Sequence, residues 1–128
     1  MKCNFKFFGM FFVLSIFVVS MFGICSFAKT GNYATLYGHY YYNGSDGRDY
    51  AYANVTNNTS TKRYISASLK NENNNVIIGR ENNISAKKML GIPDTDVTSY
   101  NTVIAHCTVY NSATPSSGTA ETLSEYVK

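Results

Sequence analysis

The stretch that decides the fold is residues 40–52, which read YYYNGSDGRDYAY. Asn-Gly and Asp-Gly, both present here, are the dipeptides that tight β-turns prefer, because they adopt positive φ at little cost. The flanking residues, 32–42 and 50–57, are rich in tyrosine, threonine and valine, which favour strands. The stretch therefore predicts a β-hairpin whose strands carry a cluster of tyrosines.

Two registers of this hairpin are compatible with the sequence. One pairs Tyr40 with Tyr52, and the other, shifted by one residue, places Tyr50 and Tyr52 beside Tyr41 and His39. A one-residue shift moves every side chain to the opposite face of its strand, so the two registers expose different rings. Both nevertheless predict an aromatic surface around the turn.

Such a surface suits a sugar ring or a protein partner, because tyrosine offers a flat apolar face and a hydroxyl. The competing interpretation is that the rings fill the core, since little other aromatic material is present to do so. We predict a binding surface made of Tyr37, His39, Tyr41, Tyr50 and Tyr52.

Further strands are predicted at 62–70, 76–78 and 97–111, where apolar and polar residues alternate or short apolar runs occur. Polar turns rich in asparagine and serine separate them. Strands at this spacing are typical of an antiparallel β-sandwich, and we expect a single all-β domain of five to seven strands.

Two segments are ambiguous. Residues 82–93 fit either a short helical turn at 85–90 or an irregular crossing. Near the C-terminus, Ala120, Leu123 and Val127 fit one short helix about as well as the intervening residues fit a strand.

Residues 1–28 predict a signal peptide. Two lysines precede an apolar stretch at 7–24, and Ser26 and Ala28 place small residues at the positions that a signal peptidase reads. The next residues are polar, so we expect cleavage after Ala28 and secretion of a mature domain, 29–128.

Two alternatives to this cleavage exist. The apolar stretch approaches the length that spans a bilayer, which would make it an uncleaved anchor. Cleavage before Cys25 would give a lipoprotein, although the preceding Phe22-Gly23-Ile24 is a poor match to the small residues that such a site requires.

Cleavage after Ala28 changes the composition of the domain. All eight Phe leave with the leader and the chain has no Trp, so 11 Tyr and two His are the remaining aromatic residues. Cys107 becomes the only cysteine, which excludes an internal disulfide and favours a Gram-positive bacterial source. Nine basic residues remain against eight acidic ones, a net charge of +1, which argues against binding to nucleic acid.

Catalytic chemistry is not indicated. Cys107 lies on the apolar face of its predicted strand, whereas the adjacent His106 points to the opposite face, so the two do not form a nucleophile and base. Zinc would need three or four ligands from the same small set, with only His39 in addition. We therefore expect no catalytic residue, no metal and no cofactor.

One resemblance is carried by the hairpin. Residues 40–45, then Ala51, Ala53 and Val55, and finally 57–59, resemble the β-sandwich lactococcins, secreted bacteriocins thought to bind the cell-wall precursor lipid II. Members of that family are shorter and usually carry Trp, which this chain lacks. The resemblance implies a small secreted sandwich that binds a component of the cell envelope.

These observations lead to one functional hypothesis and one alternative. The first is a secreted, non-enzymatic, bacteriocin-like protein that binds a cell-envelope component or surface glycan. The alternative is a structural or adhesive matrix protein that self-associates as a homo-oligomer, because exposed strand edges and a low net charge favour assembly.

Overall fold

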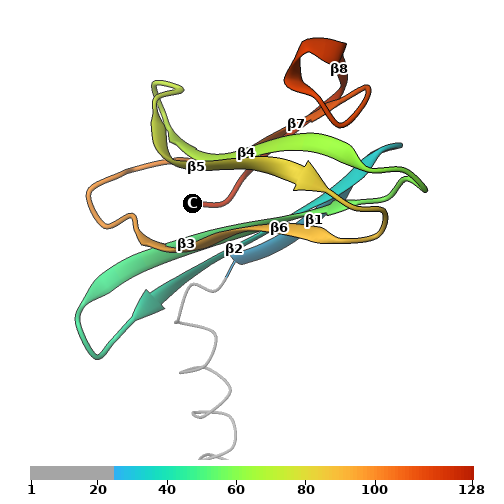
Figure 1. Ribbon diagram of the computed structural model, residues 1–128. Coiled ribbons are helices and arrows are strands. Elements are labelled where there is room, and N and C mark those ends of the chain that lie inside the picture. The colour runs from blue at the N-terminus through green and yellow to red at the C-terminus, as the bar shows by residue number, and fades with distance from the viewer. Residues whose placement is uncertain (1–24) are drawn as a thin grey trace, which may run out of the picture.

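The computed structural model describes residues 25–128, and the predicted leader residues 1–24 lie outside the described part. Eight strands form two four-stranded antiparallel sheets that face each other (Figure 1). They are β1 (Cys25–Thr30), β2 (Ala34–Asn43), β3 (Arg48–Asn57), β4 (Arg63–Asn71), β5 (Val76–Ile84), β6 (Met89–Asp96), β7 (Val103–Tyr110) and β8 (Thr119–Tyr126). The first sheet has the order β1-β2-β3-β6 and the second β5-β4-β7-β8. The all-β prediction is confirmed.

One aliphatic core lies between the sheets. Alternate side chains of each strand point inward, so a strand such as β7 buries every second residue while the residues between them stay partly exposed. The first sheet contributes mainly alanine, valine and leucine, including Leu36 and Val55, and the second contributes Ile65, Leu69 and Val109. Alternation thus sets which residues of the hairpin face the core and which face outward.

Neither alternative for residues 82–93 is correct, because most of this segment belongs to strands β5 and β6 instead of a helical turn at 85–90 or an irregular crossing. Residues 85–88 form the turn between β5 and β6, and Lys87 adopts a positive φ of 61°. The amide of Lys87 donates to the carbonyl of Asn57 at 2.9 Å, and the amide of Asn57 donates to the carbonyl of Lys88 at 2.9 Å. These bonds to the end of β3 satisfy the backbone that a helix would otherwise have to satisfy within itself.

The C-terminal helix is also wrong, because this segment is strand β8. It pairs with β7 from Ile104 opposite Tyr126 to Tyr110 opposite Thr119. A helix here would leave the edge of β7 without hydrogen-bond partners, whereas the strand satisfies that edge and still buries Leu123. Within residues 25–128 the only helical segment is a 3₁₀ turn, Pro115–Ser117.

The strand count exceeds the predicted five to seven because β1 is formed by residues 25–30, most of which the sequence assigns to the leader. The strand predicted at 97–111 is shorter than expected, since Val97 is buried in the connection that precedes β7. In the described residues Cys25 and Cys107 are both free thiols.

A carboxylate joins the two sheets at the start of the hairpin. Glu121 of β8 accepts hydrogen bonds from the backbone amides of Asn32, Tyr33 and Ala34 at 2.7, 3.0 and 3.0 Å. Hydrogen bonds to an ionised group are about twice as strong as neutral ones. This contact holds the β1–β2 turn, and therefore the start of β2, against the second sheet.

Candidate binding surface

The hairpin β2–β3 adopts the second of the two registers considered above. Tyr41 lies opposite Tyr50, and His39 lies opposite Tyr52. The four-residue loop 44–47 sets this register, with Gly47 at φ 70° and its amide donating to the carbonyl of Asn43 at 2.9 Å. Glycine adopts such a φ without the steric cost that a Cβ atom would add.

This register gathers the five predicted residues into one surface, which we call the aromatic surface: Tyr37, His39, Tyr41, Tyr50 and Tyr52. The ring centroids of His39 and Tyr52 lie 5.2 Å apart, and those of Tyr37 and Tyr52 lie 6.1 Å apart. His39 and Tyr41 are separated by 5.7 Å, and Tyr41 stacks on Tyr50 at 5.7 Å with an interplanar angle of 21°. The rings therefore form one continuous series across both strands.

The aromatic surface lies on the outer face of the first sheet. The residues that alternate with its rings, such as Leu36, Ala51 and Ala53, are buried in the core. The interpretation that the rings fill the core is therefore wrong for these five residues. Two hairpin tyrosines point to the other side of β2: Tyr40 packs against the core, and Tyr42 lies beyond it and is exposed.

Carboxylates lie beside the rings at the turn end of the aromatic surface. The Tyr50 hydroxyl donates to Asp46 at 2.8 Å, and this bond raises the pKa of Tyr50. Partial burial, then the charges of Asp94 and Asp46, raise the pKa of Tyr41. Burial, and then a hydrogen bond with Tyr37, raise the pKa of Tyr52. The hydroxyls therefore stay neutral at physiological pH, and each can donate and accept a hydrogen bond.

The sequence analysis missed these neighbours of the rings. Asp46 belongs to the turn, and Asp94 belongs to β6, which pairs with β3 next to the aromatic surface. The alternation of Leu90 and Ile92 in β6 is the available signal, because it indicates a strand within the ambiguous segment 82–93. Ser26 of β1 also reaches the surface, through a hydrogen bond between its hydroxyl and His39 Nδ1.

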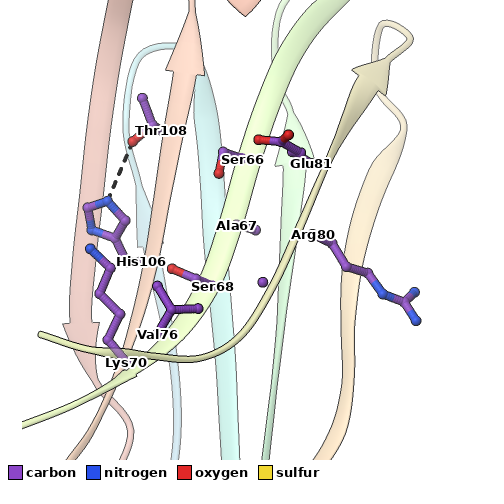
Figure 2. Close-up of a pocket in the computed structure, with 10 residues that line it drawn as sticks. Ser66, Ala67, Ser68, Lys70, Val76, Arg80, Glu81, His106 and Thr108 are labelled. Carbon is purple, nitrogen blue, oxygen red and sulfur yellow. Dashed lines mark hydrogen bonds between the residues drawn. The ribbon is translucent and has the colours of Figure 1, made fainter.

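The outer face of the second sheet is different. It carries a shallow hollow of about 460 Å³, floored by small side chains of β4 and β5. Figure 2 shows Ser66 and Ser68 beside the hollow with His106 and Lys70 on one side of it, while the Arg80 side chain extends away. Serine and glycine at alternate positions leave this space unfilled.

His106 is the one ring in this hollow. Its Nδ1 lies 2.7 Å from the Ser124 hydroxyl and its Nε2 lies 3.4 Å from the Thr108 hydroxyl. Burial, and then the charge of Lys70, lower the pKa of His106. The pair of Ser124 and His106 resembles the first two members of a hydrolytic triad, but the hydroxyl of Thr108 occupies the place of an orienting carboxylate.

Cys107 lies where its strand pattern predicts. It is fully buried on the inner face of β7, and burial raises the pKa of its thiol to about 12. The reactive form of cysteine is the thiolate, so this thiol is a small hydrophobic group of the core at physiological pH.

In residues 25–128, no three or more histidine, cysteine, aspartate or glutamate side chains gather closely enough to hold a metal ion. No helix of the same residues is long and apolar enough to cross a membrane. Comparison with known proteins finds no matching family model, no matching curated protein and no matching solved structure.

Proposed function

We propose that this protein is secreted after removal of its leader and binds a component of the cell envelope, without catalysing a reaction, as a bacteriocin-like effector. The observation that carries the proposal is the aromatic surface, five rings in one series on the outer face of a sheet. These rings are only partly buried, so their faces remain available to a ligand.

The chemistry of the aromatic surface favours a glycan. Ring faces pack against the C–H faces of sugars, and neutral tyrosine hydroxyls donate and accept hydrogen bonds with sugar hydroxyls. The carboxylates of Asp46 and Asp94 add acceptors at the turn end. A flat series of rings on a sheet fits an extended polymer better than a small enclosed ligand, which would need a concave pocket.

The test is binding of the fluorescently labelled secreted protein to Gram-positive cells and to purified envelope fractions. We expect saturable binding. The triple variant Tyr41→Ser, Tyr50→Ser, Tyr52→Ser should weaken it at least tenfold, which corresponds to about 1.4 kcal/mol.

The second sheet offers a matched control. Tyr64 and Tyr110 form an edge-to-face pair on its outer face, with centroids 5.5 Å apart. The double variant Tyr64→Ser, Tyr110→Ser removes a comparable exposed aromatic pair and should leave binding unchanged. Equal loss in both variants, or no loss in the triple variant, would contradict a binding role for the aromatic surface.

A further inference from the structure

Strand β1 covers one edge of the hairpin with residues that the predicted cleavage removes. Residues 25–28 pair with residues 37–40 of β2, whereas Lys29 and Thr30 pair with Leu36 and Thr35. Cleavage after Ala28 therefore leaves only the last two residues of β1 in place. The edge of β2 then becomes free from Tyr37 to its end at Asn43.

This free edge is suited to pairing with another strand. Residues 37–43 read YGHYYYN, with no lysine, arginine, acidic residue or proline to discourage strand addition. Phe27 lies directly over Gly38, so that a Cβ atom built on Gly38 would overlap the Phe27 ring. Removal of Phe27, which packs against the core, leaves an apolar notch above Gly38.

We propose that leader removal turns β2 into a docking edge for a second copy of the chain. The two copies form a two-fold dimer in which β2 pairs antiparallel with the partner's β2. This proposal rests on the predicted cleavage after Ala28 and is independent of envelope binding.

The register of this dimer follows from the free segment. Pairing residues 37–43 with the same residues of a second copy centres the contact on Tyr40, which lies opposite the partner's Tyr40. Paired residues then share a face of the sheet, as antiparallel strands require. The same register places Tyr42 opposite the partner's Gly38.

Tyr42 is the reason for proposing a second copy of the chain as the partner at this edge. Its side chain is 43% exposed and points to the same side of β2 as Gly38. In the dimer each Tyr42 ring takes the position over the partner's Gly38 that Phe27 holds before cleavage. An exposed ring and the notch that fits it thus lie four residues apart on one edge.

The dimer also extends the aromatic surface. Tyr41 lies opposite the partner's His39, so the two ring series meet across the two-fold axis on the outer face. Because the contact uses the same edge of both copies, it is closed and adds no third copy. It therefore differs from the open assembly of a matrix protein.

Sedimentation of two chains tests the proposal. One chain contains residues 29–128, and the other contains residues 25–128 with Cys25→Ser to remove the exposed thiol. Within residues 25–128, all buried apolar residues lie between Ala34 and Val127, so both chains keep the core. We expect a dimer for 29–128 and a monomer for 25–128. The same mass for both chains, or larger assemblies of 29–128, would overturn the proposal.

Variants at two glycines test the contact between Gly38 and the partner's Tyr42. Gly38→Ala adds a methyl group where the partner's Tyr42 ring would lie, and should weaken dimerisation of 29–128 at least tenfold. Gly44→Ala is the control, because a Cβ at Gly44 meets no atom within 4 Å. Unchanged dimerisation of a folded Gly38→Ala variant would refute the role of the notch.

Disulfide cross-linking tests the register in chain 29–128. His39→Cys and Tyr41→Cys lie opposite each other in the proposed dimer, within the range that a disulfide spans. The mixture of the two variants should cross-link on oxidation, and each variant alone should not. Cross-linking of either variant alone would overturn the register centred on Tyr40, and no cross-link in a sedimenting dimer would overturn β2 pairing. Envelope binding is measured on the unsubstituted chains 29–128 and 25–128, so it can succeed or fail separately from dimerisation.

Discussion

The two faces of the hairpin β2–β3 differ in a way that packing does not require. The buried part of the inner face is built mainly from small and aliphatic residues, of which the largest is Leu36, and Tyr40 is only partly buried beside them. The outer face of the same strands carries the aromatic surface. The chain thus places its larger side chains where the sheet meets solvent and its smaller ones in the core.

This difference distinguishes the residues that stabilise the hairpin from the residues that the hairpin exposes to solvent. Cross-strand pairs on a sheet surface contribute about 0.2–1 kcal/mol each, and threonine or valine pairs would serve as well. Partly exposed rings gain more from burial against another molecule, at about 25 cal/mol per Å² of apolar surface. This comparison supports the binding role that we propose for the outer face.

The largest expected effect is a difference in stability between variants at two adjacent residues, one on each face of β2. Leu36→Ala should lower the free energy of unfolding by about 2–5 kcal/mol, because it opens a cavity in the core. Tyr37→Ala removes a ring from the outer face and should cost about 1 kcal/mol, the value of an aromatic pair. Urea unfolding of both variants measures this. Equal losses would mean that the outer rings support the fold as much as the core does.

The hairpin was predictable because its signals are local. The turn 43–47 and the alternating strands on either side lie within 26 residues of sequence, so no distant contact decides them. The choice between the two registers was not predictable, because tyrosines occupy both faces of β2 and the alternation there is ambiguous. The structure selects the register in which Leu36 and Gly38 of β2 share the core face with the alanines and Val55 of β3.

The two segments for which a helix was considered take their structure from partners that are distant in the sequence. Residues 119–126 form β8 because β7 offers an open edge, and residues 85–88 form a turn because the backbone of Asn57 bonds to it. A short apolar segment carries no local sign of either contact. Residues 25–28 belong to the predicted leader, so their pairing with β2 in the uncleaved chain was not expected from the sequence.

A smaller difference in stability is expected between variants at two asparagines of β3, one buried and one on the outer face. Asn57 is fully buried, and its side-chain amide donates to the carbonyls of Thr61 and Ile84 at 2.8 and 2.9 Å. Asn57→Ala should cost about 1–3 kcal/mol, because it leaves buried carbonyls without donors. Asn54→Ala, on the outer face of the same strand, should change stability by at most about 0.5 kcal/mol. Thermal unfolding of the pair distinguishes the two faces, and a larger loss at Asn54 would contradict this account.

The smallest effect concerns Tyr40, the hairpin tyrosine that packs against the core. Its hydroxyl donates to Asp49 at 2.9 Å, and Asp49 also accepts from Lys128 at 2.6 Å. Burial, and then the bond to Asp49, raise the pKa of Tyr40 to about 12. The hydrogen bond from Lys128 is the main cause that lowers the pKa of Asp49.

These shifts give the stability of the fold a pH dependence that Tyr40→Phe should change. Because the folded-state pKa of Tyr40 lies above its ordinary value of 10, its contribution is complete below pH 10 and is lost as the pH rises towards 12. Asp49 has the opposite sign, so its contribution is present above pH 3.8 and is lost as the pH falls below that value. Tyr40→Phe should cost about 1 kcal/mol at pH 7, for one hydrogen bond, and should flatten the loss of stability between pH 10 and 12. Tyr41→Phe, on the outer face, is the matched control and should retain most of that slope, since Tyr41 lacks the bond to the Asp49–Lys128 pair. Urea unfolding at pH 7, 10 and 11.5 measures both variants, and an unchanged slope in Tyr40→Phe would mean that another group causes the alkaline loss.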